Sequence, residues 1–119
     1  MTGDRPDSTT RGFRVHCYDR EDGLVAECHG KLTFENTRVL KDAVRERIPG
    51  RKRIVIDLKE VPHVDSSGLG AVVGLYVSAR TRGCQLELVN ASQQIRDLFS
   101  MTNLLSLFEA AGRHYGKTI

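Results

Sequence analysis

A chain of 119 residues with 39% hydrophobic and 28% charged residues has the composition of one globular domain that buries its own core. Its formal net charge is only +3 and aromatic residues make up 6%, so the dense basic surface of a nucleic-acid-binding protein is not expected. No run approaches the roughly 20 apolar residues that cross a bilayer, and three cysteines without a C-x-x-C motif indicate a reduced, cytoplasmic protein.

The first residues, 1–11, are small, polar and charged, and we expect a flexible N-terminal tail there. The domain is predicted to span residues 12–111, and residues 112–119 to form a weakly ordered C-terminal tail. At the start of the domain, apolar and polar residues alternate with a period of two around a turn rich in Asp, Glu and Gly. This pattern predicts a β-hairpin over residues 13–29.

Helices and strands are predicted to alternate after the hairpin, because helical apolar stripes and short apolar runs follow one another. The first helix is capped by Thr33 or Asn36 and stopped by Pro49 and Gly50, and a strand over 54–58 follows it. Next come a helix over 67–80 and a strand over 86–89. The last elements are a helix capped by Asn90 or Ser92 and a closing segment over 104–108. The order β-β-α-β-α-β-α is typical of an α/β domain with a small mixed, mostly parallel sheet, whose first strand is an antiparallel edge.

The stretch V-D-S-S-G-L-G, residues 64–70, stands between the buried strand over 54–58 and the helix that follows it. Free backbone N–H groups and the positive end of the helix dipole favour negative charge at such a junction. A serine that only caps the helix would explain one hydroxyl but neither the second nor the glycines. Within a helix, Gly70 and Gly74 each cost roughly 1 kcal/mol relative to alanine.

One face of this helix is predicted to consist of small residues, which let another backbone approach closely. That backbone belongs either to this protein or to a partner. The residues of this face are Ser67, Gly70, Ala71, Gly74 and Ser78.

The junction matches neither of two sequence patterns that are typical of enzymes. Its glycines read G-x-G-x-x-x-G rather than the dinucleotide-binding G-x-G-x-x-G, and no P-loop motif occurs. A G-x-S-x-G nucleophile also fails, because Val64 and Asp65 stand before the serines, and His63 is too near in sequence to be the obvious base. Catalysis by this chain is therefore not expected.

The hairpin carries two cysteine–histidine pairs, His16-Cys17 and Cys28-His29, that resemble metal ligands. Adjacent residues of a strand point to opposite faces, so one residue of each pair points away from the other. We expect buried cysteines beside surface histidines, and no metal.

The hairpin, Gly30 and Leu32, the apolar strand, the D-S-S-G-L-G string and the strand over 86–89 follow one another in an order that resembles the STAS domain family. Within that family the chain is most similar to bacterial anti-sigma factor antagonists of the SpoIIAA type, over about residues 12 to 110. The D-S-S-G-L-G string resembles the branch that is regulated by phosphorylation. The resemblance implies helices packed mainly on one face of the sheet, and a binding switch rather than an enzyme.

The resemblance also implies partners. The unmodified antagonist binds an anti-sigma factor that is itself a serine kinase with a GHKL-type ATP site, and this binding frees the sigma factor. The kinase uses ATP and Mg²⁺ to phosphorylate the antagonist, and a PP2C-type phosphatase reverses the reaction, so the antagonist needs no cofactor of its own. The acceptor falls on Ser67, with Ser66 as the rival acceptor and as a residue expected to help start the helix.

A partner-binding surface is expected around the acceptor. Asp65 matches the family's acid before the serines, Lys31 stands where acids are common in the family, and His63 has no counterpart that we can assign. The expected surface consists of Lys31, His63, Asp65, Ser66, Ser67, Gly68, Leu69, Gly70, Gly74 and Ser78.

Two other functions stay open at this point. One is a STAS scaffold or small-ligand sensor, in a signalling assembly or associated with a transporter. The other is an enzyme with Ser67 as nucleophile, for which the sequence suggests no base.

Overall fold

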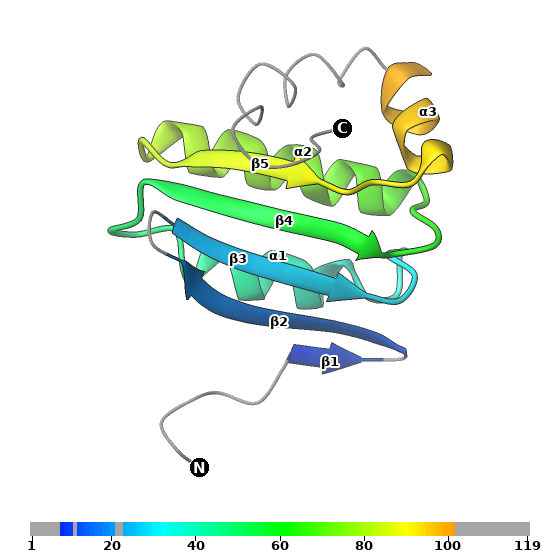
Figure 1. The fold of residues 1–119 in the computed structure, drawn as a ribbon, viewed down its shortest axis with the longest axis horizontal. Helices are drawn as coiled ribbons and strands as arrows, with labels where there is room; N and C mark the ends of the chain where they lie inside the picture. Colours follow the sequence, from blue (N-terminus) through cyan, green and yellow to red (C-terminus); the bar gives the residue numbers. More distant parts are fainter. Residues whose placement is uncertain (1–7, 11, 21–22, 102–119) are drawn as a thin grey trace.

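A computed structural model of the chain describes residues 8–10, 12–20 and 23–101. Eight elements follow one another in these residues (Figure 1). They are β1 Ser8–Thr10, β2 Phe13–Arg20, β3 Gly23–His29, α1 Thr37–Arg45, β4 Arg53–Glu60, α2 Ser66–Thr81, β5 Gln85–Val89 and α3 Gln93–Met101. No helix within the described ranges is long and apolar enough to cross a membrane.

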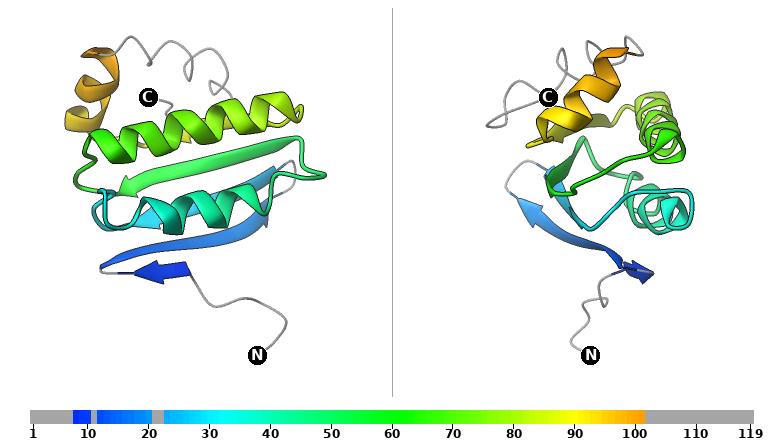
Figure 2. Two further views of the ribbon diagram at one scale, coloured as in Figure 1. Left: turned by 180° about the vertical axis from the view of Figure 1, so that it is seen from behind. Right: turned by 90° about the vertical axis from the view of Figure 1, so that its right-hand side faces the viewer.

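The strands form one mixed sheet in the order β1-β2-β3-β4-β5. β2 pairs antiparallel with β1 and with β3, whereas β3, β4 and β5 pair in parallel. α1 and α2 lie side by side on one face of this sheet, and α3 lies beyond its β5 edge (Figure 2). The expected small mixed α/β sheet, with helices mainly on one face, is confirmed.

The N-terminal edge of the sheet differs from the prediction in two ways. β1 lies inside the segment 1–11 that was expected to be a tail, and its pairing with β2 makes the strand from Phe13 an inner strand. Because β1 adds a second antiparallel pairing, two of the four strand pairings are parallel, rather than most of them. Short polar strands such as Ser8–Thr10 carry no apolar alternation, so the sequence offered no signal for it. The predicted closing segment over 104–108 and tail over 112–119 lie outside the described residues.

The main core fills the space between the sheet and the two helices. Alternate residues of β4, such as Ile54 and Ile56, point into it, and α1 contributes Leu40 and Val44 from its apolar stripe. The largest side chains that are fully buried are Phe13, Phe99, Leu32, Leu40, Ile54, Ile56, Leu58, Leu75, Leu86, Leu88 and Ile95. Packing against this core holds the axes of α1 and α2 along the strands and so sets the spacing between the two helices.

The opposite face of the sheet carries a smaller apolar cluster and a buried ion pair. Val25, Val55 and Val89 form the cluster. On the same face, Arg53 Nε lies 2.8 Å from Glu87 Oε2, and its Nη2 donates a hydrogen bond of 3.1 Å to Glu87 Oε1. Glu87 is fully buried, so this bidentate contact supplies the charge partner that a buried carboxylate requires.

Replacing Arg53 alone with methionine should lower the free energy of unfolding by about 3 kcal/mol, because the Glu87 carboxylate then stays buried without its cation. The paired replacement Arg53→Met with Glu87→Leu should recover most of that loss, because no charge remains buried. Urea unfolding of the wild type, the single and the double variant measures the coupling between the two residues. Equal destabilisation by the single and double variants would contradict the assigned pairing.

Candidate functional site

The start of α2 is held in place by the connection that follows β3. Leu32 forms an isolated parallel bridge with Val64, in which the Leu32 N–H donates to the His63 carbonyl at 2.9 Å and the Asp65 N–H donates to the Leu32 carbonyl at 3.2 Å. Gly68 lies directly against this bridge, because an added Cβ would lie 2.5 Å from the Leu32 oxygen. The glycine is therefore required for the close approach of the helix to the loop.

Asp65 is the N-cap of α2 and also ties down the neighbouring loop. Its Oδ1 accepts a hydrogen bond of 2.9 Å from the Gly68 N–H, and its Oδ2 accepts one of 3.1 Å from the Phe34 N–H. Ser66, which was expected to help start the helix, is its first residue and Ser67 its second, while Asp65 rather than a serine is the cap. A carboxylate at this position is favoured by the helix dipole as well as by the free N–H groups.

The electrostatics of Asp65 follow from these contacts. Desolvation of the carboxylate acts to raise its pKa, but hydrogen bonds from the backbone N–H groups of Gly68, Phe34 and Ser67, together with nearby His63, outweigh it. The pKa of Asp65 is therefore held below its usual value, and the residue is charged at neutral pH.

Asn36 organises the same loop from within. Its side chain is buried, its Nδ2 donates to the Lys31 carbonyl at 2.9 Å, and its Oδ1 accepts from the Thr33 N–H at 2.9 Å. Asn36 occupies the N-cap position of α1, as one of the two predicted caps, but its side chain bonds to the loop rather than to the helix.

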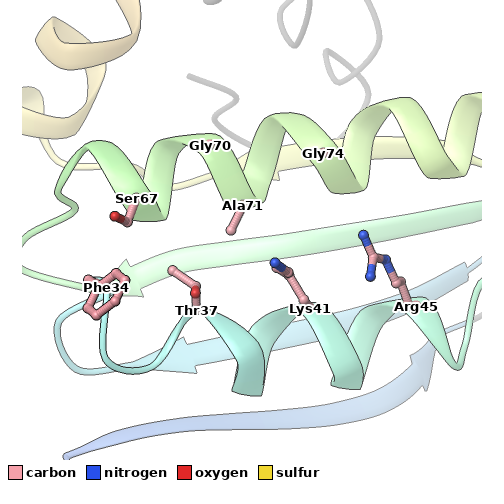
Figure 3. A pocket seen from close by; sticks show the side chains of 8 residues that line it. All are labelled: Phe34, Thr37, Lys41, Arg45, Ser67, Gly70, Ala71 and Gly74. Carbon is pink, nitrogen blue, oxygen red and sulfur yellow. The ribbon is translucent and has the colours of Figure 1, made fainter.

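Ser67 lies at one end of a groove between α1 and α2, with a cavity volume of about 340 Å³. Thr37, Lys41 and Arg45 of α1 point toward α2, and Ser67 and Ala71 point from α2 toward α1 (Figure 3). The side chain of Ser67 is partly exposed and makes no hydrogen bond to any other described side chain. The residues that line the groove are Phe34, Thr37, Lys41, Arg45, Ser67, Gly70, Ala71 and Gly74.

The small face of α2 opens onto this groove rather than onto the protein's own backbone. A Cβ added at Gly70 or at Gly74 would have no atom within 4 Å. Of the two alternatives left open by the sequence, the structure therefore excludes close packing of these two glycines against the described part of the protein itself.

The structure divides the residues expected to bind a partner into three groups. Asp65, Ser66, Ser67, Gly70 and Gly74 lie together along the start of α2 and the groove. Gly68 is buried against Leu32, and Leu69, only 8% exposed, belongs to the main core, so both act through the fold. Lys31 and His63 are exposed on the two paired loops, and Ser78 lies further along α2, outside the groove lining; these three are separate from the groove.

Sequence reasoning missed the α1 side of the groove. Thr37, Lys41 and Arg45 recur every four residues and so form one stripe of the helix, but the sequence pattern assigned no binding role to them. Phe34 gave a second signal of a binding site, because it is a large apolar residue in a predicted loop. In the structure its side chain is 77% exposed.

The cysteine–histidine pairs of the hairpin diverge as expected. Cys17 and Cys28 pack with the main core, whereas His16 and His29 lie on strand positions of the opposite face. Burial raises the pKa of the Cys28 thiol well above its usual range. In the part of the chain that the structure describes, no three histidine, cysteine or acidic side chains form a group that could hold a metal ion.

This sheet, its helices and the serine-bearing junction define a known class of small α/β domain. Residues 15–117 match the family model of the STAS domain, and the chain therefore belongs to the STAS domain family.

Relatives of the chain include proteins named for antagonism of anti-sigma factors. The anti-sigma-B factor antagonist of Bacillus subtilis (strain 168) is 26% identical over 104 residues, which cover 87% of this chain and 95% of that protein. An anti-sigma factor antagonist structure from Mycobacterium paratuberculosis has a TM-score of 0.73 at 20% identity, covering 81% of this chain and 82% of that one. The structure of the anti-sigma factor antagonist SpoIIAA in its unphosphorylated form has a TM-score of 0.66 at 19% identity, covering 76% of this chain and 81% of that one. The two structural likenesses show the fold.

Gly68 and Gly70 stand in the same turn of α2 but in different surroundings, and together they give a matched test of the site. Gly68→Ala should lower the free energy of unfolding by about 1–3 kcal/mol, because the new methyl group overlaps the Leu32 carbonyl. Gly70→Ala should raise it by up to about 1 kcal/mol, because alanine favours a helix and the added Cβ meets open space. Thermal and urea unfolding measure both. Equal effects would contradict the close contact at Gly68.

Asp65→Ala should lower the free energy of unfolding by about 1 kcal/mol at pH 7, because the cap of α2 is lost. Asp65→Asn keeps a capping oxygen and isolates the effect of charge. Since the folded-state pKa of Asp65 is lowered, the stability that its charge contributes is present above the ordinary pKa near 4 and disappears as the pH falls through the folded-state value. The wild type should thus exceed Asp65→Asn in stability at pH 7 and converge with it in acid; a constant difference would contradict the assignment.

Proposed function

We propose that this protein is an anti-sigma factor antagonist whose binding is switched off by phosphorylation of Ser67. The observation that carries the proposal is the position of Ser67, at the second residue of α2 and at the end of an open groove. Membership of the STAS domain family, the D-S-S-G-L-G string and the similarity to proteins named anti-sigma factor antagonists support it.

In the proposed cycle the unmodified protein binds an anti-sigma factor that is a GHKL-type serine kinase, and the sigma factor is released. The kinase, with Mg²⁺, transfers the γ-phosphoryl group of ATP to Ser67 Oγ, and ADP and a proton leave. A PP2C-type phosphatase hydrolyses the phosphoserine back to serine and inorganic phosphate. This chain supplies only the acceptor hydroxyl and the binding surface, so the proposal is of a binding protein, acting in the cytoplasm where ATP is available. Its three cysteines are free, as in a reducing compartment.

The position of Ser67 allows modification without damage to the fold. A phosphate adds about −1.5 to −2 charges and three acceptor oxygens. In the first turn of α2, these charges lie at the positive end of the helix dipole, which favours them. Because the Ser67 side chain makes no hydrogen bond to another described side chain, its modification breaks none within the described part of the chain. The phosphorylated domain is therefore expected to stay folded.

The same phosphate acts strongly on a bound partner. A partner that covers the groove would have to desolvate a doubly charged group or dissociate from the groove. A penalty of about 3 kcal/mol would weaken binding by more than a hundredfold. Phosphorylation thus releases the partner through the interface rather than through unfolding.

Ser67→Ala should bind the kinase constitutively, and Ser67→Asp should bind it poorly. Ser66→Ala is the matched control: it removes the neighbouring hydroxyl, and it should bind, accept phosphate and release the kinase as the wild type does. The measurements are pull-down against the GHKL-type kinases of the same cell, and phosphopeptide mass spectrometry after incubation with ATP and Mg²⁺.

Equal binding by the wild type, Ser67→Ala and the stoichiometrically phosphorylated protein would contradict the switch. Phosphate mapped to Ser66 instead would move the acceptor by one residue. Stable binding to a larger assembly without any phosphate exchange would favour a STAS scaffold.

A further inference from the structure

We propose that the groove between α1 and α2 binds an acidic segment of the partner through Lys41 and Arg45, and that phosphate on Ser67 competes with this segment for the same two cations. The inference rests on the proposed function and adds to it the chemistry by which the partner is recognised. It also assigns a binding role to α1, which the sequence did not suggest.

The two cations of the groove, Lys41 and Arg45, have no ion-pair partner among the described residues. Lys41 and Arg45 are four residues apart on α1 and point across the groove toward α2 (Figure 3). Within the described residues neither forms an ion pair or a side-chain hydrogen bond, and none of the eight lining residues is acidic.

Three arginines that follow α1 in the chain are paired with acids, unlike these two. Arg47 pairs with Glu46 at 2.9 Å, Arg51 pairs with Asp19, and Arg53 pairs with Glu87. Among the described residues, the positive charge at the groove that contains Ser67 is therefore left without an acidic partner. Such a site is complementary to carboxylates of another protein.

The shape of the groove suits a polypeptide segment rather than a single ion. Its volume of about 340 Å³ accommodates several side chains. Its α2 wall carries no side chains at Gly70 and Gly74, and nothing lies within 4 Å of where their Cβ atoms would be, so a backbone can approach the helix. Phe34, 77% exposed at the Ser67 end, offers an apolar contact next to the charged ones.

The position of Ser67 in the same lining connects recognition to regulation. A phosphoserine carries about −1.5 to −2 charges, which match the two positive charges of Lys41 and Arg45. A phosphate at this end of the groove neutralises the cations and repels carboxylates that approach them. Release of the partner then follows from competition for charge in addition to the bulk of the phosphate.

Charge reversals test the groove against a matched control. The probe is the purified kinase that transfers phosphate to Ser67, and the dissociation constant is measured at two salt concentrations. Lys41→Glu and Arg45→Glu should each weaken binding of the unphosphorylated protein by about tenfold or more. Lys59→Glu makes the same charge change at an exposed residue of β4 outside the groove, and its effect should stay within about threefold. Unchanged thermal unfolding shows that each variant is folded.

A second measurement tests the competition directly. Phosphoserine is incorporated at position 67 during translation, in the wild type and in the double variant Lys41→Gln with Arg45→Gln. Phosphorylation should weaken kinase binding by a smaller factor in the double variant, because the contested cations are gone. An equal factor in both proteins would overturn the competition.

The outcomes separate the two proposals. If Ser67 phosphorylation leaves kinase binding unchanged, the proposed function fails. If phosphorylation releases the kinase but Lys41→Glu and Arg45→Glu behave as Lys59→Glu does, the proposed function stands and the acidic-segment proposal is overturned.

Discussion

The backbone contact between Leu32 and the turn that contains Val64 determines where the functional part of this protein lies. Through it, the loop after β3 and the loop after β4 continue the parallel pairing of their strands beyond the sheet. Asp65 then caps α2 with one carboxylate oxygen and holds the Phe34 N–H with the other. Gly68 allows α2 to start directly against Leu32, and the groove runs between α1 and α2 from Ser67 to Arg45 and Gly74.

The two faces of the sheet contribute to the fold in different ways. The face under α1 and α2 is an apolar core that fixes the positions of the helices. The opposite face combines a small valine cluster with the buried pair of Arg53 and Glu87. A buried ion pair contributes little net stability compared with apolar residues of similar volume, but losing one partner is costly. The pair therefore constrains the register of β4 against β5 more than it stabilises the domain.

The elements that bury apolar residues and the α2 side of the groove could be predicted from the sequence, and the α1 side of the groove could not. Period-two alternation located the hairpin, and the helical stripes located α1 and α2, because burial imposes these periods on the sequence. β1 was missed because the sequence of Ser8–Thr10 is polar throughout and shows no apolar alternation. The α1 side of the groove was missed because a cation that faces a groove and one that faces bulk water occur in the same local sequence pattern. Only the packing of α1 beside α2 distinguishes them.

The junction also explains why one serine of the adjacent pair is the better acceptor. Ser66 is the more exposed of the two, so exposure alone would favour it. Ser67, however, points into the space between the helices, where Lys41 and Arg45 supply positive charge and where the glycines leave room for another chain. A phosphate on Ser66 would lie in water, where dissolved salt screens its charge over about 10 Å. A phosphate on Ser67 would change the charge of the groove itself, and control of binding requires the charge to lie where the partner binds.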